Sequence, residues 1–202
     1  LILFSQSMWL SLSASLFIIS LGFFAEDIFA ATVHAAEVQR LERIYFTILC
    51  NGSIFHLAMI TFGTFFSGRG LTRPVMLTTF AGVLINIPLD YAMIFGQFGL
   101  PEMGIAGAAT ATVLSWLINT LILAKLTFTR RNNRSFAIVS AWRLHPQRFL
   151  RLLRFGIPGA LQFTIDVAVF TVFILLVGRI STDALAATNI VFSVNALSFM
   201  PA

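Results

Sequence analysis

The sequence predicts an all-α membrane protein, a polytopic bundle of transmembrane helices. Hydrophobic residues make up 58% of the 202 residues and charged residues only 10%, whereas a soluble domain carries about 25% charged residues. Apolar runs of about 20 residues, which as helices would cross roughly 30 Å of hydrocarbon, recur six times along the chain. The charge on the connecting loops also alternates from one loop to the next. Too few charges are present to cover a water-soluble globule.

The first three spans are predicted at 3–24, 45–66 and 75–96. The first run is followed by further spans and has no cleavage pattern, so we interpret it as a span rather than a signal peptide. The second contains the single cysteine, Cys50, which excludes an internal disulfide framework. The third contains Pro88, which a transmembrane helix tolerates.

The last three spans are predicted at 105–127, 155–177 and 184–202. The fourth opens with a cluster of small residues, and the fifth begins just before a proline. The sixth is still apolar at Ala202, and the chain starts at Leu1 rather than at a methionine. We therefore expect the chain to be a fragment of a longer protein.

The loops divide into a strongly basic set and a mixed set. Loops 67–74 and 128–154, together with Lys125, carry ten cations and no acids. Loops 25–44, 97–104 and 178–183 carry three cations and six acids. By the positive-inside rule the basic side is cytoplasmic, which also supports six spans. The net charge of +5 is thereby explained without a nucleic-acid partner, so nucleic-acid binding is not expected.

The segment from Trp142 to Arg154 allows two interpretations. Pro146 is suited to open a helix that carries Arg148, Arg151 and Arg154 among apolar residues. Such a segment either lies in the lipid headgroup layer, attracted by anionic lipid, or is a solvated linker with topogenic charges. In both cases 128–154 is the longest loop and the best boundary between two halves.

Asp90 is one of only two acids inside the predicted spans, and it has an amide partner. A charged Asp at the bilayer centre costs roughly 3 kcal/mol, so such residues are usually functional. Asn86 precedes it by one helical turn and shares its face, and Pro88 frees a backbone carbonyl nearby. These groups predict an oxygen site for a small cation or a proton. The alternative is that Asp90, near the outer end of its span, reaches the interface.

The second acid, Asp166, is eight residues past Pro158, about halfway across the fifth span. Its short side chain has no cation within a turn, so we expect it to face a polar cavity or to stay protonated. His56, midway in the second span, is either a buried, hydrogen-bonded residue or a proton relay. The pattern of His, Cys and acidic residues predicts no transition-metal cluster.

Small residues are dense between Gly104 and Thr112, which favours close helix packing in lipid. Thr110 and Thr112 either serve that packing or contribute to a polar site.

Several ordered motifs together resemble the MATE (multidrug and toxic compound extrusion) family. The motifs are 66–73, 86–91, 101–112, 154–158 with Asp166, and 185–190 leading to 199–201. The resemblance covers the chain from about residue 45 to its end and is weaker before that. It implies a twelve-helix, two-lobed transporter of which these spans are helices three to eight. Residues 1–128 would then complete the N-terminal lobe, 129–154 link the lobes, and 155–202 begin the C-terminal lobe.

The same resemblance implies a function and site residues. The family exports cationic or amphipathic organic compounds against inward flow of Na⁺ or H⁺, with no other cofactor, from a bacterial-type plasma membrane. Asn86, Asp90 and Thr112 correspond to its first coupling site, with Thr110 as the alternative threonine. Asp166 corresponds to an acid, commonly Glu, in the second lobe. Na⁺ would bind at Asn86 and Asp90. We expect polar or aromatic residues of the spans to line the substrate cavity: Tyr91, Gln162, Asn189 and Asn195.

Two other functions, and a fragment without activity, are the alternatives to an exporter. A lipid-linked saccharide flippase of the same superfamily would need a cationic cavity, and these spans contain no central Arg or Lys. A membrane-embedded hydrolase would need its two acids close in space, and Asp90 and Asp166 fall in separate halves. A fragment of six spans would be inactive by itself. The oligomeric state, the exported compound and the coupling ion do not follow from the sequence.

Overall fold

The computed structural model describes residues 2–30, 36–129, 132, 145–181, 184, 187–188 and 190–194, and in this part of the chain it contains helices and no strand. The helices are α1 (Ile2–Phe23), α2 (Ala25–Ala30), α3 (Ala36–Ser67), α4 (Thr72–Ile94), α5 (Ile105–Thr127) and α7 (Pro146–Ile180). Five of them, all except α2, are long and apolar enough to cross a membrane. The predicted sixth span, 184–202, lies largely outside the described residues.

Two helices begin well before the apolar runs that predicted them. Helix α3 begins at Ala36 rather than near residue 45, and most of the predicted loop 25–44 that is described is helical, including α2. Helix α7 begins at Pro146 rather than near residue 155, so the basic segment and the fifth span form one continuous helix. Hydropathy detects only the part of a helix that is apolar, while polar helix-forming residues extend both helices beyond it.

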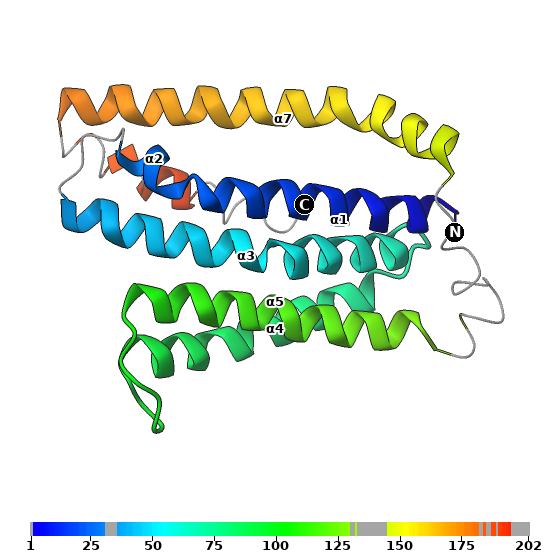
Figure 1. Ribbon diagram of the computed structural model, residues 1–202, viewed down its shortest axis with the longest axis horizontal. Helices are drawn as coiled ribbons and strands as arrows, with labels where there is room; N and C mark the ends of the chain where they lie inside the picture. The colour runs from blue at the N-terminus through cyan, green and yellow to red at the C-terminus, as the bar shows by residue number, and fades with distance from the viewer. Residues whose placement is uncertain are drawn as a thin grey trace. The chain divides into compact units, whose positions relative to one another are not determined.

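The chain divides into two units, Leu1–Phe149 and Leu150–Ala202. In the first unit α3 is the central helix, packing against α1 on one side and α5 on the other, and α4 packs mainly against α5 (Figure 1). In the second unit the described structure is mostly the rest of α7, whose residues are largely exposed. Whether these units are the lobe segments predicted above stays a prediction.

A cluster of aromatic residues forms the core of the first unit near one end of α3. Phe62, Phe65 and Phe66 of α3 pack with Leu123 of α5, and all four are at most 8% exposed. Phe4 of α1 contacts this cluster, with its ring centroid 5.3 Å from that of Phe65. The cluster therefore joins α1, α3 and α5 at the end of the bundle where α3 ends.

The small residues at the start of α5 allow the close packing predicted from the sequence. Ala109 and Ala111 are completely buried. At Gly107 an added Cβ would lie 2.4 Å from the backbone oxygen of Met93 in α4, closer than real side chains come. Gly107 thus brings the backbones of α4 and α5 together where the candidate site residues lie.

Candidate functional site

Asp90 is half-buried on α4, one turn before the helix ends. The Asn86 side chain one turn earlier interacts with the carboxylate, while Oδ1 of Asp90 and Nδ2 of Asn86 are both buried without another hydrogen-bond partner among the described residues. A carboxylate that simply reached the membrane interface would expose both oxygens to water. The burial of Oδ1 therefore favours the interpretation of Asp90 as an inward-facing acid.

A pocket of about 180 Å³ lies between α3, α4 and α5. It brings Asn86 together with Thr112, two residues that the sequence predicted for one site, and adds Ser115, Trp116 and Asn119 of α5. Asp90 and Thr110 are not among its lining residues. The Thr112 hydroxyl donates to the backbone oxygen of Ala108 at 3.0 Å, which leaves its lone pairs available to a ligand. Between the two threonines the geometry favours Thr112 over Thr110.

The oxygen atoms of two residues on α4 and one on α5 are of the types that suit a hard cation or a proton. Asp90, Asn86 and Thr112 offer carboxylate, amide and hydroxyl oxygens, the ligand types suited to alkali and alkaline-earth ions rather than to softer metals. Among the described residues no group of three His, Cys, Asp or Glu is placed to hold a metal ion. The chemistry open to this site is the binding and release of one small cation, or protonation of the carboxylate.

His56 of α3 lies beside the same pocket. Its ring packs on Trp116, with centroids 4.5 Å apart. Its Nδ1 atom is buried and has no hydrogen-bond partner, so the expected hydrogen bond is not formed at this nitrogen. Trp116 lines the pocket, and His56 packs against the Trp116 ring.

Two lining residues, Ser115 and Asn119, were missed from the sequence. Both are on α5, and with Thr112 they recur at helical spacing, three and then four residues apart. That spacing puts all three on one face of the helix. The polar stripe was therefore present in the sequence as a signal, although none of its three residues is charged.

The remaining predicted site residues are not brought into this pocket. Tyr91 is 55% exposed and packs on Phe95, with ring centroids 5.3 Å apart. Gln162 and Asp166 are exposed on α7, one turn apart, in the second unit. Asn189 and Asn195 lie outside the described residues.

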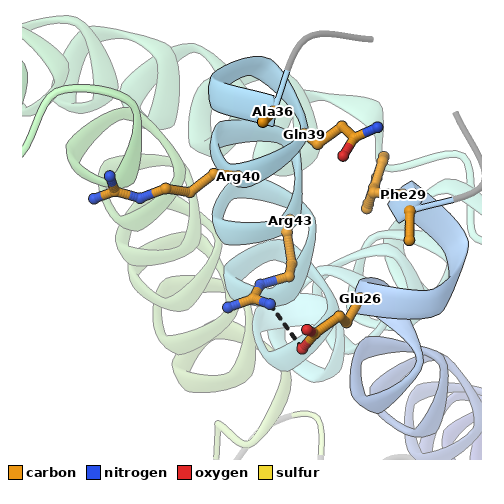
Figure 2. A pocket seen from close by; sticks show the side chains of 7 residues that line it. Glu26, Phe29, Ala36, Gln39, Arg40 and Arg43 are labelled. Atoms are coloured by element: carbon orange, nitrogen blue, oxygen red, sulfur yellow. Dashed lines mark ion pairs between the residues drawn. The ribbon is translucent and has the colours of Figure 1, made fainter. Parts of the chain in front are cut away.

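A larger pocket, of about 350 Å³, lies between α2 and the first turns of α3, in the predicted loop 25–44. Figure 2 shows Arg43 pointing to Glu26, with which it forms an ion pair at 2.7 Å, while Arg40 extends from α3 in another direction. Both side chains of the pair are substantially exposed to solvent. An ion pair this exposed contributes about 0–1 kcal/mol to the free energy of unfolding. The exposure of the side chains that line the pocket indicates a solvated surface rather than a binding site.

The long apolar helices, with a pocket that contains several polar residues between three of them, define the class: an integral membrane protein built as a bundle of transmembrane helices. The comparisons with known proteins then identify the family. The MatE family model matches residues 2–92. The probable multidrug resistance protein NorM of Thermotoga maritima is 36% identical over 171 residues, and the match covers 82% of this chain and 35% of that protein. The chain belongs to the MATE family.

Two further comparisons agree with this assignment. NorM, a multidrug resistance protein of Vibrio cholerae, is 32% identical over 138 residues, which cover 68% of this chain and 30% of that protein. A solved structure, the inward-facing conformation of a multidrug resistance MATE family transporter of the MOP superfamily, matches 96% of this chain and 44% of its own. That match has a TM-score of 0.76 and 23% identity, and it supports the fold. The chain spans about a third of the length of the two NorM proteins.

Proposed function

We propose that the full-length protein is a secondary active transporter that exports drug-like organic compounds, cationic or amphipathic, in exchange for Na⁺ or H⁺. The names of its relatives, multidrug resistance proteins, support the class of exported compound. One observation carries the coupling mechanism: Asp90 has a buried carboxylate oxygen with no partner among the described residues other than the Asn86 side chain, one turn away in the pocket with Thr112. An acid in that position needs a cation, a proton or water to satisfy it.

In this mechanism the coupling ion neutralises Asp90 and changes which conformation of the bundle is favoured. The change requires the ion to bind one conformation more tightly than the other, because a ligand shifts an equilibrium only by its difference in affinity. Asn86 would orient an oxygen toward the ion, and Thr112 would offer a hydroxyl lone pair from α5. Since these groups come from two helices, a relative movement of α4 and α5 would change the ion affinity.

The second unit would supply a second acid and part of the substrate cavity. Asp166 and Gln162 are one turn apart on α7 and would share a face. We assign Asp166 to ion coupling, and Gln162, Tyr91, Asn189 and Asn195 to the cavity that receives the exported compound. The arginine-rich loops 67–74 and 128–154 would face the cytoplasm of a bacterial-type cell, which follows from their charge.

Drug efflux by the full-length protein tests the proposal. Asp90→Asn and Asp166→Asn keep the shape of each side chain but remove its charge, and we expect each to reduce drug efflux at least about tenfold. Glu102→Gln is the matched control, because Glu102 is an exposed acid in the loop between α4 and α5. Wild-type efflux by both Asp variants would overturn the mechanism. In proteoliposomes, drug movement driven by a sodium gradient at fixed pH would identify Na⁺ as the coupling ion.

A further inference from the structure

A glutamine near the start of α1, Gln6, is completely buried although its side chain carries an amide. Burying an amide without hydrogen bonds is costly, and a membrane interior offers no water to replace them. The Nε2 atom of Gln6 donates to Ser5 Oγ at 3.2 Å. Its Oε1 atom accepts a hydrogen bond from the backbone N–H of His145, far along the chain, at 3.1 Å. A side chain of α1 therefore holds the backbone at the end of the loop that precedes α7.

His145 is the residue from which α7 begins. Its carbonyl oxygen accepts hydrogen bonds from the N–H groups of Arg148 and Phe149, both at 3.0 Å, in the first turn of the helix. Pro146, the first helical residue, has no N–H group and a fixed φ that suits this position. The N–H of His145 thus binds α1 through Gln6, while its carbonyl belongs to α7. Gln6 fixes the point from which α7 starts.

The loop before α7 is attached to the first unit at both ends. At its beginning, the Phe128 ring packs on Phe62 of the aromatic cluster, with ring centroids 5.9 Å apart. At its end, His145 is held by Gln6 within the same unit. If His145 were released, residues 129–144 would be a long tether that follows α7 without pulling on the first unit. The hydrogen bond to Gln6 prevents this.

We infer that Gln6 is a positioning residue for transport, which keeps the start of α7 on the first unit through the whole transport cycle. The inference rests on the proposed function, because a secondary transporter works by movement of one helix bundle against another. With its start held at α1, α7 passes such a movement directly to the unit that contains Asp90. With its start free, the loop would take up the movement instead.

Hydrogen exchange in the full-length protein tests the contact itself. Gln6→Leu keeps the size of the side chain and removes its oxygen and nitrogen, so we expect the His145 amide to exchange at least about fivefold faster, as for the loss of one hydrogen bond. Gln147→Leu is the matched control, because Gln147 is an exposed glutamine in the first turn of α7. It should leave the exchange at His145 unchanged. A wild-type exchange rate in Gln6→Leu would overturn the inference.

Drug efflux tests the role in transport. We expect Gln6→Leu to lower the maximal efflux rate per folded molecule at least about fivefold. The coupling-ion concentration that gives half-maximal efflux should stay within about twofold of wild type, because Gln6 does not line the pocket with Asn86 and Thr112. A merely structural role would lower the unfolding midpoint in detergent and leave the rate per folded molecule unchanged. That result, or an equal loss of rate in Gln147→Leu, would contradict the role in transport.

A covalent link shows whether the contact stays closed during transport. In a background where Cys50 and any other cysteine are replaced, Gln6→Cys and His145→Cys are combined and joined by a short bifunctional methanethiosulfonate. We expect the unjoined pair to transport slowly, like Gln6→Leu, and the joined pair to recover at least about half of the wild-type rate. Inhibition by the link would mean that the contact has to open in the cycle, and the inference would be wrong.

The two proposals fail separately. If Asp90→Asn transports normally while Gln6→Leu is slow, Asp90 does not couple transport and the role of Gln6 stands. If Asp90→Asn abolishes efflux while Gln6→Leu transports at the wild-type rate, the role of Gln6 is wrong and the coupling acid stands.

Discussion

At the scale of single residues, two threonines of α5 allow a test of which hydroxyl belongs to the ion site and which only packs. Thr110 and Thr112 each donate to the carbonyl one turn earlier, at 2.7 and 3.0 Å. Only Thr112 lines the pocket with Asn86. Thr112→Val keeps the shape and removes the oxygen, so we expect it to weaken coupling-ion affinity about tenfold, the effect of one lost hydrogen-bond-like contact. Efflux rate measured against ion concentration reports this affinity.

Thr110→Val is the matched control for that experiment. It removes the same hydroxyl from the same helix, and we expect the ion affinity to stay within about twofold of wild type. A larger loss from Thr110→Val than from Thr112→Val would assign the site threonine to the other position, two residues earlier.

A substitution at His56 tests whether this residue packs against Trp116 or relays protons. Its ring packs on Trp116, and Phe at this position would preserve the aromatic contact while removing both nitrogens. We expect His56→Phe to leave the pH profile of efflux unchanged and the rate within about threefold of wild type, as a packing role requires. A flattened pH profile in a variant of normal stability would instead indicate a proton relay through His56.

The residues that the sequence could predict were those with strong individual signals. Asn86 and Asp90 were found because a carboxylate in an apolar run is costly and its neighbour four residues away must share its face. Thr112 was predicted through the family resemblance. Ser115 and Asn119 were missed because their importance depends on how α5 is rotated toward α4, which packing at Gly82 and Gly107 determines and which one helix alone does not specify.

At the scale of whole helices, the positions of the spans were predictable and their ends were not. The apolar runs located α1, α4 and α5 closely. Helix α3 extends to Ala36 through charged residues, where Glu37 and Arg40 come within 4.0 Å one turn apart. Helix α7 extends to Pro146, whose fixed φ suits the first helical position. Hydropathy measures compatibility with lipid, whereas these extensions follow from helix propensity and from the fixed φ of Pro146.

The contact between α4 and α5 gives a prediction at this scale. Gly107→Ala would put a methyl group 2.4 Å from the Met93 backbone oxygen, and a backbone cannot move aside as a side-chain tip can. We expect a loss of about 1–3 kcal/mol of stability, typical of overpacking, and a lower thermal unfolding midpoint in detergent.

Gly63→Ala is the control for Gly107→Ala. Gly63 is also buried in a helix, but its added Cβ would meet only Val75 Cγ1, at an ordinary 3.7 Å. Because Ala is the better helix former, stability should be unchanged or slightly raised. A midpoint for Gly107→Ala equal to that of Gly63→Ala would show that α4 and α5 are not held at this close distance.

At the scale of the whole molecule, the orientation in the membrane is the property on which the mechanism depends. Helix α4 separates the short loop at Leu71, on the basic side, from the loop containing Glu102, on the acidic side. If α4 spans the bilayer, these two loops face opposite compartments, and by the positive-inside rule we expect Leu71 to face the cytoplasm. Both residues are exposed in the structure and are suited to labelling.

We therefore expect Glu102→Cys, in a full-length background without other cysteines, to be labelled in intact cells by a membrane-impermeant maleimide. Leu71→Cys should be labelled only after the membrane is permeabilised, because its loop would face the cytoplasm. The reverse pattern would invert the topology and leave Asp90, one turn from the Glu102 end of α4, nearest the cytoplasm. Labelling of both cysteines in intact cells would show that α4 does not span, and Asp90 would then have no membrane interior in which to couple an ion to transport.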